Sequence, residues 1–133
     1  MRAVLDPNVL ISAVLSPAGT PARLLLRWQS GEFELLISRL LLAELKRALA
    51  YPKLRERVSA SQAGELLAWL ERAATVVEDP GGTPAFRSSD PDDDYLLALA
   101  GAHRAALVSG DKHLLSLAGD LPIFSAVDFL DSL

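Results

Sequence analysis

The sequence predicts an α/β domain in which a mainly parallel sheet of about four to five strands is flanked by helices on both faces. Short apolar runs that suit strands alternate with longer segments of helical periodicity. Most of these short runs are apolar throughout, as is typical of parallel strands that are buried on both faces. With 133 residues, half of them hydrophobic, residues 1–133 fit a single domain with a substantial core.

Proline and glycine mark the expected ends of several elements. Pro7 closes the first strand and suits the first turn of the helix that follows. Gly31 ends the second helix, and Pro52 breaks the pattern of the third. Residues 79–89, rich in Gly, Pro and Ser, form the clearest loop. The expected strands are 2–6, 33–38, 75–78, 106–109 and 121–124, and the expected helices are 8–15, 20–30, 40–50, 54–58, 59 or 61 to 74, one from about Asp92, 111–118 and 125–131.

Acidic residues are concentrated between Ser88 and Lys112. Four aspartates fall within five residues, at 90 and 92–94, and Asp111 follows a short strand and a glycine. One or two of them would serve as helix caps, but two carboxylates about 4 Å apart repel by roughly 4 kcal/mol at an effective dielectric of about 20. A cation would relieve that repulsion, so the stretch indicates a metal site. Asp90 and Asp92 suit loop and capping roles better than a ligand role.

The composition limits which metal this site could hold. There is no cysteine, and the two histidines, His103 and His113, cannot form a His-rich zinc site alone. The ligands must therefore be mainly oxygen atoms, which suits Mg²⁺ or Mn²⁺. We expect His103 to be structural and His113 to be a surface residue.

Two acidic residues are expected at the carboxyl ends of strands, where ligands bind in parallel sheets. Asp6 ends the first strand, and Asp111 follows the fourth strand after a glycine. Asp93 and Asp94 begin the helix that leads into that fourth strand, and either could contribute. Glu44 lies at the border of the apolar stripe of its helix, and it joins the site only if that helix packs beside the first strand.

Three or four carboxylates with room for water suit metal-assisted hydrolysis of a phosphodiester. A phosphorylation receiver domain also has an acidic Mg²⁺ pocket, but it requires an acidic pair after the first strand, and here one acid stands there. A haloacid-type phosphatase would require an aspartate two residues after Asp6, where Asn8 stands.

The same residues carry a family resemblance, which extends over nearly the whole chain. The set of motifs resembles the PIN-domain nucleases, in particular the bacterial, VapC-like toxin components of toxin–antitoxin pairs. The opening AVLDPNVLISAVLSPAGTPARLLLRW is similar to the family's first strand, with its leading Asp and following Asn. FELLISRLLLAELKRALAYPKLRERV is similar to its second strand and the helix with an acidic residue. SSDPDDDYLLALA and ALVSGDKHLL are similar to its last two acidic motifs.

The resemblance implies a PIN-like fold and a Mg²⁺- or Mn²⁺-dependent endoribonuclease that is often dimeric and often neutralised by an antitoxin protein. The acidic residues that it assigns to catalysis and metal binding are Asp6, Glu44, Asp94 and Asp111. Asp93 is the competing choice for the third ligand, and Asn8 and Ser109 are supporting polar residues. Pro7 stands where the family commonly has Thr, and Ser109 where Thr is also usual. The alternative is a PIN fold that binds RNA or a protein without cutting.

Charge is distributed unevenly along the chain. The formal net charge is −4, yet residues 21–63 hold eight Lys/Arg against four Glu, and residues 78–94 hold six Asp/Glu against one Arg. A basic segment beside an acidic pocket suits a polyanion that approaches a metal. Expected phosphate contacts are Arg23, Arg39 and Lys112.

Location and assembly are the remaining expectations. The apolar start lacks the charged head and cleavage site of a signal peptide and is too short to span a bilayer, so we expect a cytoplasmic protein without membrane contact. The apolar faces of the 20–30 and 60–74 helices are candidate homodimer surfaces. Trp28 and Trp69 lie on those faces and suit the core or such an interface.

Overall fold

A computed structural model describes residues 1–81, 94–119 and 121–133, without the side chain of Asp94. It contains one five-stranded sheet in the order β3-β2-β1-β4-β5, in which every neighbouring pair is parallel. The strands are β1 (Arg2–Leu5), β2 (Glu34–Ile37), β3 (Thr75–Val76), β4 (Ala106–Val108) and β5 (Ile123–Phe124). The helices are α1 (Pro7–Leu15), α2 (Thr20–Gln29), α3 (Arg39–Leu49), α4 (Pro52–Arg55), α5 (Ala60–Ala73), α6 (Asp94–Ala102), α7 (Lys112–Leu115) and α8 (Ala126–Ser132).

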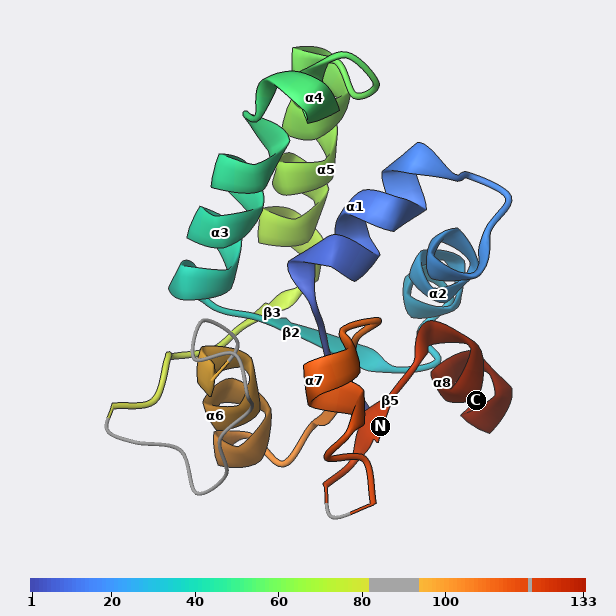
Figure 1. The fold of residues 1–133 in the computed structure, drawn as a ribbon, viewed down its shortest axis with the longest axis vertical. Coiled ribbons are helices and arrows are strands. Elements are labelled where there is room, and N and C mark those ends of the chain that lie inside the picture. Colours follow the sequence, from blue (N-terminus) through green and yellow to red (C-terminus); the bar gives the residue numbers. More distant parts are fainter. Residues whose placement is uncertain (82–93, 120) are drawn as a thin grey trace.

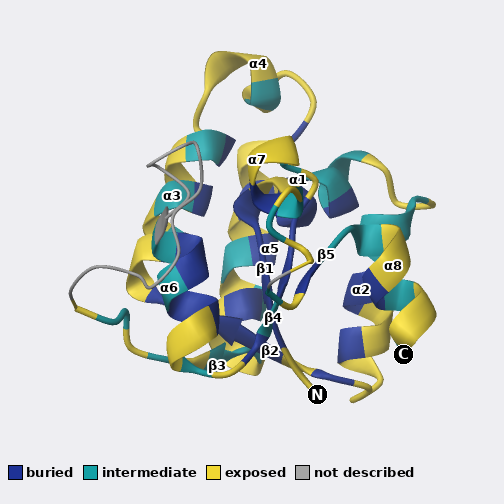
Figure 2. Ribbon diagram, turned by 60° about the horizontal axis from the view of Figure 1, so that its bottom comes forward, coloured by how far each residue is buried: buried dark blue, intermediate teal, exposed yellow. Residues whose placement is uncertain are grey.

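Helices cover the sheet on both faces, which confirms the predicted fold class. In Figure 1, α3 and α5 lie on one side of β2 and β3, and α6 lies on the other. α1 stands between α3 and α2, and α8 packs against α2. The strands and the inward faces of the helices form the buried centre, whereas α4 is largely exposed (Figure 2). α3 shows how the sequence periodicity is used, because its buried residues Leu41, Leu45 and Leu49 recur every fourth position.

Two predicted helices differ from the observed ones. The helix predicted over 54–58 is found at Pro52–Arg55. It begins earlier because proline at the first helical position has no N–H to satisfy, and it ends three residues before the predicted end. The helix predicted over 111–118 ends at Leu115, and the N–H groups of Leu117 and Ala118 then donate to carbonyls three residues back, at 3.0 and 3.1 Å. The chain therefore tightens into turns there.

The strands at the two edges of the sheet are shorter than predicted. Only Thr75 and Val76 of the predicted 75–78 strand and Ile123 and Phe124 of the predicted 121–124 strand are paired as strands. Short edge strands limit the row of unpaired N–H and C=O groups that the edge of a sheet exposes. The predicted helix start near Asp92 lies outside the described residues.

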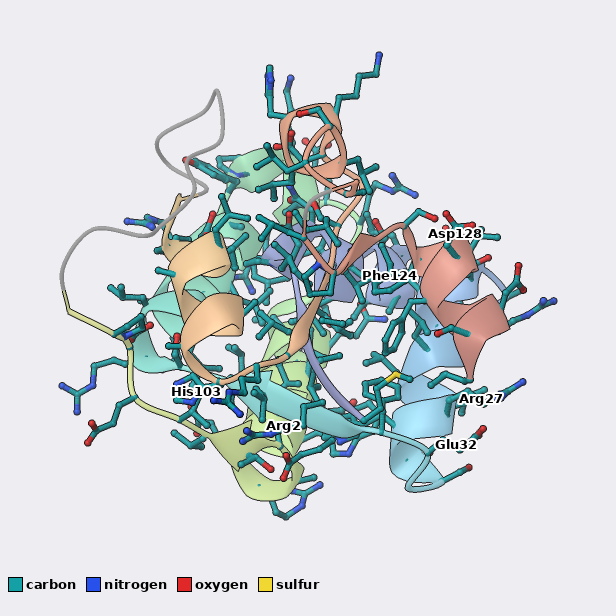
Figure 3. The ribbon with its side chains drawn as sticks, turned by 90° about the horizontal axis from the view of Figure 1, so that it is seen from below. Arg2, Arg27, Glu32, His103, Phe124 and Asp128 are labelled. Atoms are coloured by element: carbon teal, nitrogen blue, oxygen red, sulfur yellow. The ribbon has the colours of Figure 1, made fainter. Side chains whose placement is uncertain are left out.

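Arg2 ties three elements together at the amino ends of the strands. Its Nε donates to Glu34 Oε1 at 2.7 Å and its Nη1 to the carbonyl oxygen of His103 at 2.9 Å. The guanidinium, together with the Thr75 hydroxyl, lowers the pKa of Glu34. His103 Nε2 lies 2.9 Å from the Glu78 carbonyl oxygen, and Figure 3 shows His103 beside Arg2. His103 therefore lies at the opposite end of the sheet from the carboxyl ends of β1 and β4.

In the described part of the chain, no single helix is long and apolar enough to cross a membrane. α1 and α2 would suffice together in length and composition, but they are bent by 101° relative to each other.

Phe129 anchors α8 through an aromatic cluster. It is fully buried, and its ring meets that of Phe33 edge-on at 5.2 Å and that of Phe124 at 5.9 Å. We predict that Phe129→Ala lowers the free energy of unfolding by about 3–5 kcal/mol, the usual cost of removing a buried ring. Urea denaturation measures this value. Val127→Ala, at a position 54% exposed on the same helix, should change it by less than about 0.5 kcal/mol. Equal urea midpoints for Phe129→Ala and Val127→Ala would contradict the prediction that the Phe129 ring anchors α8.

Candidate functional site

The site begins where β1 and β4 end side by side. Their parallel register pairs Leu5 with Val108, and the backbone N–H of Asp6 donates to the Val108 carbonyl at 2.9 Å. The residues that directly follow the two strands, Asp6 and Ser109, are therefore brought close together. Ser109 Oγ donates to Asp6 Oδ2 at 2.8 Å, and both residues are buried, with 0% and 5% exposure. Ser109, predicted as a supporting residue, thus holds the Asp6 carboxylate directly.

Asp6 and Asp111 both lie at strand ends and both cap the helices that follow. Asp6 Oδ1 accepts from the N–H of Asn8 at 3.0 Å at the start of α1, and Asp111 Oδ1 accepts from the N–H of His113 at 2.7 Å at the start of α7. Ser109 links the two, because its Oγ also accepts from the Asp111 N–H at 3.0 Å. The expectation that both acids sit at carboxyl ends of strands therefore holds in the structure.

The pKa of Asp6 is raised above its ordinary value. Burial of the carboxylate is the largest cause, and the negative charge of Asp111 adds to it. The hydrogen bonds from Asn8 and Ser109 act in the opposite direction but do not cancel it. A charged carboxylate in this environment is unfavourable unless a positive charge joins it.

Glu44 was expected to join the site only if its helix packs beside the first strand, and the contact that the structure shows is with the helix after that strand. α3, which carries Glu44, packs against α1, the helix that starts directly after Asp6. Glu44 and Asn8 line one groove of about 680 Å³. The Tyr95 hydroxyl, from the first turn of α6, donates to Glu44 Oε2 and so connects α6 to α3 across the groove.

The third acidic position remains a prediction. Asp94 begins α6, one residue before Tyr95, but its carboxyl and the whole of Asp93 lie outside the described residues. Among the side chains that the structure does describe, no three Asp, Glu or His residues approach closely enough to hold a metal ion. The described part of the site therefore consists of Asp6, Ser109 and Asp111, which are linked by hydrogen bonds, and of Glu44 in the adjoining groove.

The donor set at this edge suits a hard cation. Asp6, Glu44 and Asp111 offer only oxygen, the ligand that Mg²⁺ and Mn²⁺ prefer. A carboxylate has about four lone-pair positions, so the hydrogen bonds from Asn8 and Ser109 leave Asp6 capacity to bind an ion. The raised pKa of Asp6 points the same way, because a nearby cation would offset both of its causes.

The predicted phosphate contacts lie in different places. Arg39 and Lys112 are exposed at the starts of α3 and α7, next to the groove residue Leu40 and to Asp111 respectively. Arg23 is exposed on α2, on the other side of α1 from α3 (Figure 1). Arg47 lines the groove itself.

Sequence reasoning did not single out Tyr95. The tyrosine falls only within the helix predicted from about Asp92, and its contact with Glu44 joins residues 51 positions apart. The sequence signal that could have indicated Tyr95 is its position in the first turn of a helix, directly after the candidate ligands Asp93 and Asp94.

A sequence model of the PIN domain matches residues 2–113, most of the chain. The chain belongs to the PIN domain family. PIN domains are generally nucleases and generally depend on a divalent metal. The matched range contains every predicted acidic residue and leaves out β5 and α8.

Solved structures share this PIN fold at low sequence identity. PAE2754 from Pyrobaculum aerophilum is similar with a TM-score of 0.69 and 20% identity, over 99% of this chain and 88% of that one. VapBC2 from Rickettsia felis, bound to a DNA fragment from its promoter, is similar with a TM-score of 0.61 and 16% identity, over 94% of this chain and 98% of that one. No curated protein sequence matches the chain.

The raised pKa of Asp6 generates a prediction about pH. A carboxyl whose pKa is higher in the folded than in the unfolded state binds more protons when folded, so stability falls as pH rises from about 4 through the folded pKa. In EDTA, Asp6→Asn should remove this loss. We expect the variant to melt at a higher temperature than wild type at pH 7, and the difference to shrink toward pH 4.

Melting curves from pH 4 to 7.5 measure that difference. Asp131→Asn, at an exposed position on α8, controls for the loss of one negative charge. A difference between wild type and Asp6→Asn that stays constant with pH would contradict the prediction.

Proposed function

We propose that this PIN domain is a metal-dependent endoribonuclease that hydrolyses RNA phosphodiester bonds. The observation that carries the proposal is the pair of acids at the carboxyl ends of β1 and β4, joined through Ser109, with Glu44 in the groove beside them. We assign Asp6, Glu44 and Asp111, with Asp94 or Asp93, as ligands of Mg²⁺ or Mn²⁺. Such an ion would polarise the scissile phosphate and lower the pKa of an attacking water.

The residues of the chain have distinct parts in this proposal. Ser109 fixes the rotation of the Asp6 carboxylate by donating to one oxygen, and Asn8 fixes it through the other. Tyr95 orients Glu44 in the same way from α6. Pro7 is the first residue of α1, where the missing N–H is not required, so it leaves the Asp6 cap intact.

We further propose that the chain is the toxin component of a toxin–antitoxin pair. The family membership and the shared fold with the VapBC2 complex support this assignment. An apolar groove of about 510 Å³ would accept a few apolar side chains of a partner protein, either an antitoxin or a second copy of the chain. The groove lies along α2 and α5, the two helices whose apolar faces were predicted as candidate homodimer surfaces. It is lined by Leu25 and Leu26 from α2 and by Leu66 and Trp69 from α5.

Metal binding can be tested without measuring activity. We expect Mn²⁺ at ten times its Kd to raise the melting temperature of wild type by about 4 °C or more, since RT ln(1 + 10) is about 1.4 kcal/mol. Asp6→Asn should lose most of this shift. Tyr95→Phe, which removes one hydroxyl, should bind Mn²⁺ at least about tenfold more weakly by titration calorimetry, as is typical when a group that orients a ligand is lost. Equal affinity in wild type and Asp6→Asn would rule out Asp6 as a ligand.

Cleavage of a labelled, mixed-sequence single-stranded RNA tests the reaction itself. Wild type should cleave with Mn²⁺ or Mg²⁺ and not with EDTA, and the Asp94→Asn/Asp111→Asn double variant should be at least about a hundredfold slower, because removing electrostatic stabilisation of the reacting centre costs that much. A library of structured RNAs extends the search if the first substrate is not cut. RNA binding with no metal-dependent cleavage across the library would favour the non-catalytic RNA-binding module instead.

A further inference from the structure

The groove beside Glu44 continues along one face of α3 well past the acidic residues. Leu40, Glu44, Ala48 and Tyr51 recur at intervals of three or four residues, the spacing of one helix face, and all four line it. Eleven residues at 1.5 Å each span about 16 Å. At about 3.4 Å per phosphate of a stacked strand, this length accommodates several nucleotides.

The far end of the groove presents an aromatic ring to solvent. Tyr51 is 60% exposed, although it lies between two helices that could have covered it. It precedes α4 and caps that helix without a side-chain hydrogen bond. The Tyr51 side chain therefore takes no part in capping α4, and its exposed ring is accessible to a ligand in the groove.

The surroundings of Tyr51 carry positive charge. Arg47, one turn earlier on α3, lines the same groove. Residues 39–57 hold six Lys/Arg, all exposed, against two Glu, although the whole chain has a formal net charge of −4. An exposed aromatic ring beside basic side chains is the arrangement that proteins use to hold unpaired nucleotides, with bases on the ring and phosphates on the cations.

We infer that Tyr51 is a stacking platform for an unpaired base of the substrate strand and that Arg47 contacts a phosphate beside that base. The inference rests on the proposed function, since Glu44 would mark the position of the scissile phosphate. Tyr51 lies seven residues beyond Glu44, about 10 Å along the helix axis. At the spacing of a stacked strand, this separation places the stacked base about three nucleotides from the cleaved bond. A duplex cannot engage the ring, because its bases are already stacked within the helix.

The closing experiment measures binding of a fluorescent single-stranded RNA of about ten nucleotides by anisotropy in EDTA, together with its cleavage in Mn²⁺. Tyr51→Ala should weaken binding at least about fivefold, the lower end of what one stacked base contributes, and Tyr51→Phe should keep wild-type affinity. Val127→Ala, at an apolar position 54% exposed on α8 and away from this groove, is the control and should bind like wild type.

A series of RNAs with one abasic position each locates the stacked base. For wild type, one abasic position should weaken binding as much as Tyr51→Ala does, and in Tyr51→Ala that position should have no further effect, because the two changes remove the same contact. Wild-type affinity and an unchanged abasic profile in Tyr51→Ala, with RNA cleavage intact, would overturn the inference and leave the proposed function standing. Wild type that neither binds nor cleaves any RNA would overturn both.

Discussion

The parallel pairing of β1 with β4 is the constraint on which the site depends. It joins residues about a hundred positions apart in sequence and ends both strands at one level, with Leu5 opposite Val108. Asp6 and Ser109 then face each other without any adaptation of the loops. A shift of this register by one residue would turn Ser109 to the other face of the sheet and separate it from Asp6. The buried strands, rather than the residues around the acids, therefore determine the geometry of the carboxylates.

The burial of the Asp6 carboxyl group at the end of β1 opposes the stability of the folded domain when that group is charged. Burial raises the pKa of Asp6, and the nearby charge of Asp111 opposes ionisation further. Ser109 and Asn8 reduce the penalty by hydrogen bonding, but the net direction of the shift shows that they do not remove it. A domain selected for stability alone would place an uncharged cap there, since serine or asparagine serves a helix N-terminus as well as aspartate does. The arrangement is reasonable if a cation completes it.

The sequence was sufficient for features set by local chemistry and insufficient for contacts between distant elements. Pro7 and the apolar run before it located the end of β1, and with it Asp6. The hydrogen bonds of Ser109 with Asp6 and of Tyr95 with Glu44 join residues 103 and 51 positions apart, so no periodicity or spacing reveals them. The same limit applied to α7, which was predicted to continue to residue 118. Its Leu, Ser and Ala residues suit a helix, and the return toward β5 after Leu115 is a tertiary requirement that local propensity does not contain.

α3 connects the two ends of the proposed RNA path. Its apolar stripe, Leu41, Leu45 and Leu49, fixes its rotation in the core, and the adjacent face then carries Glu44, Arg47 and Ala48 toward the groove. Glu44 lies within α3 and Tyr51 two residues beyond its end, so the rigid helix sets most of the distance between them. In the proposed function, the Glu44 carboxylate at the middle of α3 and the exposed Tyr51 ring beyond its end would measure a fixed length of strand. If the proposed function holds, this rigidity would let the groove select which bond of an unpaired strand lies beside the acids.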